Sequence, residues 1–329
     1  METRKVELKK LSSIPYGSLF FAPMEGITDE AFRKTILKFY PEWDFLATDF
    51  LRVPSAGKYP RKHIIRHFGQ ELFGVPWVVD KTMFQILTSH RAFTIEMIKQ
   101  IEELQFPWLD MNIGCPSNTV CKNQGGSFLL TDLVSLSSLV KTIRKNFLGR
   151  FSCKIRIGYN DTNGFEDSIK MLNDEGVELI TVHARTRDDM YKTPARWNFI
   201  EKAVKISRVP IIGNGDLWTP ADIKSMLDQT GCHGVMVARG ALKAPWIARC
   251  YKEGILKMSD TEIFNEIKIF LNGYRYMLES ENITSRGLLK QSKSVTRFML
   301  DGLNNSEEIR RKLVLSQTVS EFYSIIDGL

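Results

Sequence analysis

The feature that most constrains this chain is a strand-like apolar run that recurs eight times in the first 240 residues, each time followed by a segment of helical character. Helical stretches such as 91–104 and 219–227 lie between the runs, and the second begins with Thr219 as N-cap and Pro220 at the first helical position. Eight strand–helix alternations are typical of a (β/α)8 barrel, whereas a doubly wound sheet usually has fewer strands. We therefore expect an α/β protein with a (β/α)8 (TIM) barrel over residues 1–245. The runs are LFFAPME, FLATDFL, MFQIL, WLDMNIG, FSCKIRI, LITVHAR, VPIIGNG and GVMVARG.

The rest of the chain, residues 246–329, shows only helical periodicity, in the stretches 260–280, 287–300 and 306–326. We expect a small all-α helical bundle there, as a second domain. The formal net charge is +7, but from Cys250 onward 11 basic residues balance 11 acidic ones, so the excess (34 against 27) lies in the first 249 residues. The charge permits a polyanionic partner without requiring one.

The cysteines bear on the compartment. They number five and stand at 115, 121, 153, 232 and 250 without zinc-ligand spacing, which favours a reducing compartment over a disulfide framework. No run approaches the roughly 18 apolar residues of a membrane-spanning helix, and the first ten residues are polar. We expect a cytoplasmic monomer with no metal and no membrane partner.

A set of polar and glycine residues falls where the expected strands end, and in such a barrel the loops after the strands surround the mouth. Each type has a role if the mouth holds a planar, phosphorylated cofactor. Gly213, Gly215 and Gly240 would let backbone amides approach a phosphate. Lys154 is a cation in an apolar strand, which is costly unless it faces an anion or an electron-rich ring edge. The alternative is that some of these residues only fill the barrel. The set is Pro23, Met24, Glu25, Gln85, Cys115, Lys154, His183, Arg185, Asn214, Gly215, Asp216, Arg239 and Gly240.

Cys115 stands between Gly114 and Pro116, directly after the fourth run. A free cysteine is most often a buried hydrophobic residue. A thiol of pKa about 8.5 is also mostly protonated at neutral pH and acidic enough to protonate an enolate. The residues alone leave packing and proton donation both open.

Motifs along nearly the whole expected barrel resemble those of the flavin-dependent tRNA-dihydrouridine synthases. They are, in order, APMEGITDEAFR, FQIL, DMNIGCPSNTVCKNQGGSFLL, KIRIGY, VHARTR, IIGNGD and GVMVARGAL. The segments TDFLRV and KTPARWNFI are most similar to the bacterial C-type branch, whose members modify a D-loop uridine, with position 16 as the candidate. The resemblance implies FMN bound at the barrel mouth, NADPH as the reductant, and reduction of a uracil C5–C6 double bond in tRNA.

The resemblance also implies roles for individual residues. Those that match the flavin-contacting positions are Pro23, Met24, Glu25, Gln85, Lys154 and His183. Those that match the phosphate end are Asn214, Gly215, Asp216, Ala238 and Arg239. Cys115 matches the family's proton donor, so for this thiol the resemblance favours chemistry over packing. The sequence departs from the family at Ala238, where a glycine is usual, and at Cys121, where an asparagine is usual.

Reduction of a tRNA uridine requires that the base be flipped outward, at a cost of a few kcal/mol that backbone contacts must offset. Two basic segments are suited to those contacts. The rim after the second run, Arg52, Lys58, Arg61, Lys62 and Arg66, contains no acid. The stripe in the helical domain, Arg286, Lys290, Lys293 and Arg297, has spacings of four, three and four, which place its members on one helix face. Asn112 and Tyr191 complete the expected tRNA contacts.

Two other functions fit parts of the sequence. A flavin barrel that reduces a free pyrimidine, of the dihydroorotate type, would also use a cysteine at the mouth, but the basic rim and stripe would have no purpose there. A non-catalytic RNA-binding protein on a degenerate barrel would not need Cys115, Lys154 and the phosphate-binding loops. We therefore expect a tRNA-dihydrouridine synthase, with the free-pyrimidine oxidoreductase as the alternative.

Overall fold

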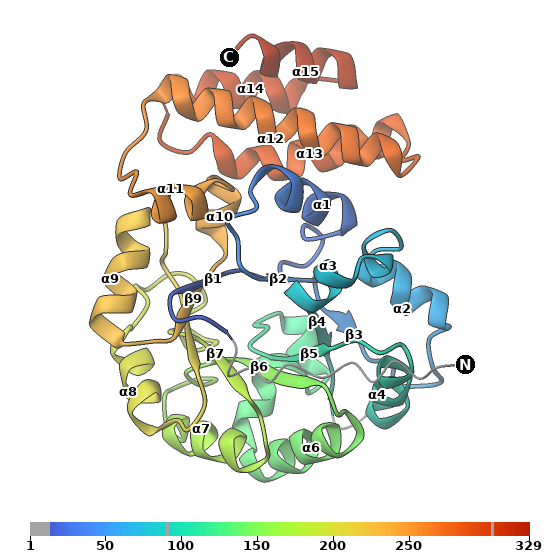
Figure 1. Cartoon of the computed structure of the whole chain (residues 1–329), viewed down its shortest axis with the longest axis vertical. Coiled ribbons are helices and arrows are strands. Elements are labelled where there is room, and N and C mark those ends of the chain that lie inside the picture. The colour runs from blue at the N-terminus through green and yellow to red at the C-terminus, as the bar shows by residue number, and fades with distance from the viewer. Residues whose placement is uncertain (1–13, 90–91, 304–305) are drawn as a thin grey trace.

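A computed structural model of the chain describes residues 14–89, 92–303 and 306–329. Within these ranges the strands are all parallel and form one ring, ordered β1-β9-β8-β7-β6-β5-β4-β2, with β3 further along β4 (Figure 1). A bridge between Phe20 and Phe45 joins β1 to the residue before β2 and closes the ring. The expected (β/α)8 barrel is therefore confirmed. The strands are β1 (Ser18–Phe21), β2 (Leu46–Ala47), β3 (Leu51–Arg52), β4 (Thr82–Leu87), β5 (Trp108–Ile113), β6 (Arg150–Arg156), β7 (Leu179–His183), β8 (Ile211–Asn214) and β9 (Gly234–Val237).

The second expected strand is interrupted, which its apolar run did not indicate. It forms two short segments, β2 and β3, and Asp49 lies between them. The Asp49 carboxylate is 3.2 Å from Nε2 of His67, and the backbone carbonyl of Asp49 lies 2.9 Å from the same nitrogen. At the same place the backbone N–H of Gln85 in β4 donates to the Thr48 hydroxyl at 3.0 Å.

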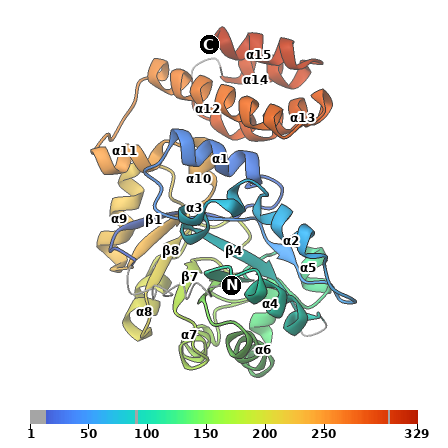
Figure 2. The ribbon, with the colours of Figure 1, turned by 45° about the vertical axis from the view of Figure 1, so that its right-hand side comes forward.

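Helices surround the barrel, as Figures 1 and 2 show. Their apolar faces cover the outward side chains of the strands, and the two sets share one continuous core. Helix α9 begins as its sequence predicts, because Thr219 and Asp222 form a capping box and Pro220 occupies the first turn. The helices of this layer are α1 (Glu30–Phe39), α2 (Arg61–Phe68), η2 (Leu72–Gly74), α3 (Pro76–Lys81), α4 (Thr94–Glu103), α5 (Asn118–Lys122), η3 (Gly126–Thr131), α6 (Leu133–Asn146), α7 (Phe165–Asp174), α8 (Asn198–Ile206), α9 (Pro220–Thr230), α10 (Arg239–Lys243) and α11 (Ile247–Glu253).

The C-terminal helices gather at one side of the barrel, beside α1 in both views (Figures 1 and 2). Phe270 lies 5.5 Å from Phe32 and 6.3 Å from Tyr40, measured between ring centroids, so this bundle shares its core with α1. The stretch 306–326 forms two helices because Thr318 caps a new one. In the described residues no helix is long and apolar enough to cross a bilayer. The helices are α12 (Asp260–Ser280), α13 (Ser285–Met299), α14 (Ser306–Leu315) and α15 (Val319–Asp327).

The interior of the barrel changes character along its axis. Alternate residues of each strand point inward. At the N-terminal end the inward residues form an apolar cluster that includes Phe20, Met83, Trp108, Leu179, Ile212 and Met236. Two or four residues further along the same strands the inward positions are polar, as at Gln85, Asp110, Lys154, His183 and Asn214. The barrel therefore has an apolar floor and a polar mouth.

Candidate active site

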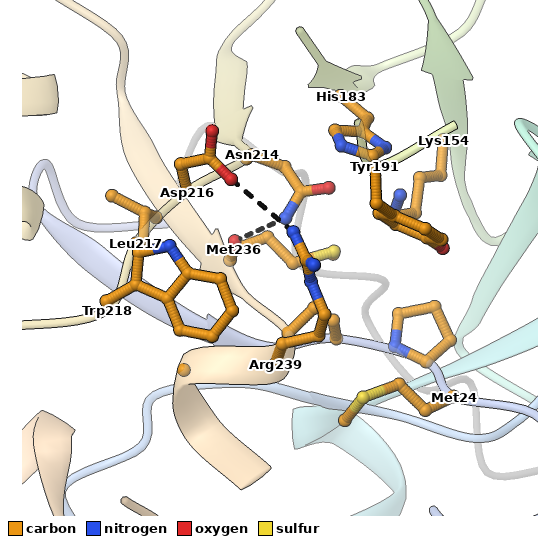
Figure 3. A pocket seen from close by; sticks show the side chains of 15 residues that line it. Met24, Lys154, His183, Tyr191, Asn214, Asp216, Leu217, Trp218, Met236 and Arg239 are labelled. Carbon is orange, nitrogen blue, oxygen red and sulfur yellow. Dashed lines mark hydrogen bonds and ion pairs between the residues drawn. The ribbon is translucent and has the colours of Figure 1, made fainter. Parts of the chain in front are cut away.

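Two adjoining hollows open at the mouth, where the resemblance places the flavin. One, of about 140 Å³, is lined by the loops after β8 and β9. The other, of about 360 Å³, is lined by the loop after β5, including Cys115 and Asn112. Figure 3 shows the first, with His183, Tyr191 and Arg239 around it. The residues that line both hollows are Pro23, Met24, Lys154, His183 and Tyr191.

Two glycines shape the first hollow. Gly215 has a φ of +124°, and a Cβ there would lie 2.9 Å from the Cβ of Ala195. A Cβ on Gly240 would overlap the Leu217 carbonyl oxygen, so α10 can approach the loop after β8 only with glycine there. Gly213, expected to have the same role, lines neither hollow, and a Cβ there would meet the side chains of Met226 and Cys232. That glycine makes room for α9.

Asn214 and Ala238 were also expected at the phosphate end. Nδ2 of Asn214 donates to the Met236 carbonyl at 2.6 Å, which ties β8 to β9. Ala238 has a φ of −109°, outside the left-handed region that favours glycine. Alanine therefore meets no positive-φ penalty at this departure from the family pattern.

The Asp216 carboxylate is occupied by protein groups. Nη2 of Arg185 donates to its two oxygens at 2.7 and 2.5 Å, and the backbone N–H of Ala195 donates at 2.8 Å. Arg239 is 3.4 Å away. These contacts, chiefly with Arg185, hold the pKa of Asp216 below its usual range. Asp216 thus orients two arginines at the mouth.

Arg239 lies between two aromatic rings at the edge of the first hollow (Figure 3). Its guanidinium carbon is 4.6 Å from the ring centre of Tyr191 and 4.8 Å from that of Trp218. Cation–π contacts on both faces favour the planar guanidinium and limit its rotation. The charge is held at the entrance with its edge open to a ligand.

The mouth carries an excess of buried positive charge. Burial and, after it, the charge of the neighbouring Arg156 lower the pKa of Lys154 to about 8. Burial lowers the pKa of His183 well below its usual value, and so do the nearby charges of Arg156, Lys154, Arg185 and Arg239. Like charges are gathered here at an energetic cost that a bound anion or electron-rich ring would offset. The hollow therefore fits a ligand such as a flavin phosphate.

Cys115 borders the second hollow on a tightly packed loop. Gly126 has a φ of +58°, and a Cβ there would lie 2.8 Å from the Cys115 carbonyl oxygen and 3.0 Å from its Cβ. Ser127 donates to the same carbonyl through its N–H at 3.1 Å and its hydroxyl at 2.9 Å. Burial raises the pKa of the Cys115 thiol, so it stays protonated at neutral pH. The thiol of Cys121 points to the Cys115 carbonyl, at 3.8 Å.

Gln85 and Asn112, expected to contact flavin and tRNA respectively, are both engaged within the protein. Gln85 is fully buried and hydrogen-bonds to Asp110 and Asn112 at 2.6 and 2.8 Å. It lines neither hollow. The Asn112 carbonyl accepts from two backbone N–H groups, and one of its amide N–H groups donates to Gln85. Only the other amide N–H of this residue is left for a base.

The expected tRNA-binding residues differ in how free they are. In the rim, Arg52 pairs with Glu25 at 3.3 Å, and the other four members are exposed. In the stripe, Arg286, Lys290 and Arg297 are exposed on α13. Lys293 differs, because its Nζ donates to the Val314 and Ser316 carbonyls at 2.8 and 2.6 Å and so closes the end of α14.

The structure also adds residues that sequence reasoning did not select. Nε of the buried Arg156 donates to the Gly114 carbonyl at 2.9 Å, and its guanidinium carbon lies 5.6 Å from the ring centre of Tyr191. The signal was present, since Arg156 follows Lys154 by two residues in one strand and shares its inward face. Trp218 gave no such signal. In the described residues no cluster of three metal-ligating side chains occurs.

Comparisons with known proteins agree with this geometry. A family model described as dihydrouridine synthase (Dus) matches residues 20–326. The tRNA-dihydrouridine(16) synthase of Pseudomonas syringae pv. tomato is 32% identical over 231 residues, 69% of this chain and 72% of that protein. The protein of the same name from Haemophilus influenzae is 27% identical over 311 residues, 92% and 97% of the two chains.

Among solved structures, the fold is similar to that of histamine dehydrogenase from Rhizobium sp. 4-9. The TM-score is 0.55 at 12% identity, over 79% of this chain and 48% of that one. At that identity the likeness shows the barrel fold only. The match over residues 20–326 goes further, because it spans both the barrel and the C-terminal helices. The chain belongs to the dihydrouridine synthase family.

Proposed function

We propose that this protein reduces the C5–C6 double bond of uridine at position 16 of tRNA, with FMN at the barrel mouth, NADPH as the reductant and Cys115 as the proton donor. The observation that carries the proposal is that two hollows adjoin at the mouth, one lined by cations and one by Cys115, and that they share five lining residues. The relatives named tRNA-dihydrouridine(16) synthase support the choice of position.

The first hollow supplies the residues that would hold FMN. The backbone at Gly215 and Gly240 leaves room for a phosphate, and Arg239 supplies a positioned charge. Lys154 and His183 line both hollows, so they would lie beside the ring. Bound FMN supplies the hydride that adds to C6 of the uracil. Because burial and the surrounding cations keep His183 neutral, this side chain would act as a hydrogen-bond partner.

Cys115 would supply the proton that completes the reduction. Addition of hydride at C6 leaves an enolate whose negative charge is shared by C5 and O4. The thiol gives its proton to C5, which forms the C–H bond, and the sulfur becomes a thiolate that solvent must reprotonate. A raised pKa suits this role because the proton is present at neutral pH.

Two basic surfaces support a tRNA substrate over a free pyrimidine. The four exposed rim residues follow β3, which leads from the mouth, and the exposed members of the stripe lie on α13. A folded RNA could contact phosphates at both places while one flipped base enters the second hollow. A free pyrimidine would use neither surface.

The test is Cys115→Ala, with Cys121→Ala as the matched control. We expect Cys115→Ala to keep bound flavin and NADPH oxidation but to lose about 10²- to 10⁴-fold in dihydrouridine formation, the usual contribution of a general acid. Cys121→Ala should stay near the wild-type rate. Flavin released by heat should be FMN, and tRNA from cells that lack the gene should lose dihydrouridine at position 16 only. Wild-type activity in Cys115→Ala, or turnover of free pyrimidines instead of tRNA, would refute the proposal.

A further inference from the structure

A continuous chain of hydrogen bonds leads from the Cys115 loop into the barrel. Oδ1 of Asn112 accepts from the backbone N–H groups of Gly114 at 3.0 Å and Cys115 at 2.9 Å. Nδ2 of Asn112 donates to Oε1 of Gln85 at 2.8 Å. Nε2 of Gln85 then donates to Oδ2 of Asp110 at 2.6 Å. Two amide side chains thus connect the loop to one buried carboxylate.

The same carboxylate receives a second set of bonds from the barrel floor. Nε1 of Trp108 donates to Oγ of Ser152 at 3.0 Å, and the Ser152 hydroxyl donates to Oδ1 of Asp110 at 2.5 Å. The parallel register explains the convergence, since it pairs Asp110 with Gln85 on one side and with Ser152 on the other. The side chains of Trp108, Ser152, Asp110 and Gln85 are at most 1% exposed.

The direction of every bond in the chain is determined from its two ends. Backbone N–H groups and the Trp108 indole can only donate. The Asn112 carbonyl must therefore face the loop, so its amide faces Gln85, and the Gln85 amide must face Asp110. At the other end, the Ser152 hydroxyl accepts from Trp108 and donates to Asp110. Both carboxylate oxygens accept, and reversing either amide would set donor against donor.

We propose that Asp110 is a positioning residue for Cys115: its Oδ2 atom fixes the orientation of Gln85 and Asn112, and through them the backbone of the loop that carries the acid. The inference rests on the proposed role of Cys115. Burial raises the pKa of Asp110, while the donors and the nearby charge of Lys154 oppose that rise. Because the Gln85 amide presents a donor to Asp110, Oδ2 of Asp110 must stay an acceptor for the chain to hold.

The test removes the acceptor that orients the Gln85 amide. Asp110→Ala deletes both carboxylate oxygens, so Nε2 of Gln85 loses its partner and the chain to the loop loses its anchor. The purified protein is alkylated with iodoacetamide, and mass spectrometry follows the Cys115 peptide. The other four cysteines are at most 6% exposed, so the reaction selects Cys115. We expect the Asp110→Ala rate to rise about fivefold, as for the loss of one hydrogen bond.

A conservative variant separates positioning from general damage. In Asp110→Asn the new amide can donate to the Ser152 hydroxyl, and the carbonyl can still accept from Gln85. The link to the loop is then kept, and the alkylation rate should stay within about twofold of wild type. Cys153→Ala, a truncation in β6 outside the chain, should leave the rate unchanged.

Two results would overturn the inference: a wild-type alkylation rate in Asp110→Ala, or an Asp110→Asn variant as reactive as Asp110→Ala. If Asp110→Ala does not fold, Gln85→Met removes the acceptor of Asn112 at similar volume, and an unchanged rate there would be equally decisive. In tRNA reduction, a positioning role predicts a loss in kcat with little change in KM. Alkylation needs no tRNA turnover, so a failure of the proposed function would leave this measurement valid.

Discussion

The packing of Gly126 against Cys115 allows a prediction with a calculated size. Gly126→Ala faces two penalties. The residue has a φ of +58°, where a side chain costs roughly 1–2 kcal/mol, and its new Cβ would lie 2.8 Å from the Cys115 carbonyl oxygen and 2.9 Å from a Val120 methyl. Contacts that short require the loop to move, and overpacking of this kind costs about 1–3 kcal/mol. The expected loss in the free energy of unfolding is about 2–5 kcal/mol.

Gly254→Ala is the matched control, because Gly254 has a φ of +73° and no atom within 4 Å of its added Cβ. It should lose only the backbone penalty of roughly 1–2 kcal/mol. Urea unfolding of both variants isolates the packing contribution as a difference. Displacement of Cys115 should also lower dihydrouridine formation by up to about 10²-fold in Gly126→Ala alone. Equal stabilities of the two variants, with full activity in Gly126→Ala, would refute the packing argument.

The remaining predictions concern charge. Lys290→Glu with Arg297→Glu should weaken tRNA binding and reduce the log–log salt slope by somewhat under about one for each phosphate that is no longer neutralised, with flavin reduction unchanged; an equal slope would assign recognition to the rim. Lys293→Ala should instead lower the free energy of unfolding by about 1–2 kcal/mol, because two backbone carbonyls are left without their donor, and a urea titration checks this. For the flavin site, Lys154 has a pKa of about 8, so FMN affinity should fall up to about tenfold per pH unit above 8. Lys154→Met should bind FMN more weakly at pH 7 without that slope; a persistent slope would point to another group.

Most of the fold could be predicted from sequence because the barrel's physical signal is local. The eight apolar runs coincide with the strands, and helix α9 begins at the capping box of Thr219, as the sequence there predicts. The interruption between β2 and β3 was not predicted, because the contacts made there, from Thr48 to Gln85 and from Asp49 to His67, are with residues distant in sequence. Local patterns determine the elements, and tertiary contacts modify their limits.

The candidate site divides in the same way. The sequence correctly indicated which residues end the strands, but it did not indicate which of their polar atoms already have partners. Gln85 is occupied by Asp110 and Asn112, and Lys293 by the end of α14. Each partner is contributed by a different strand or helix, so its identity follows only from the register of the sheet and the packing of the bundle. A residue type gives the chemistry that is possible, and the neighbours decide whether it is available.

The order of residues along the inward face explains how the barrel can hold charge at its mouth without losing its core. In β5 the inward residues run from Trp108 through Asp110 to Asn112, and in β6 from Ser152 to Lys154. The apolar floor excludes water, which strengthens the hydrogen bonds of the layer above it. That layer contains the Asp110 carboxylate, whose negative charge lies beneath Lys154 and partly offsets the cost of burying it. Because the remaining cations of the mouth outnumber their acidic partners, an anionic ligand bound there would offset their repulsion and so stabilise the fold.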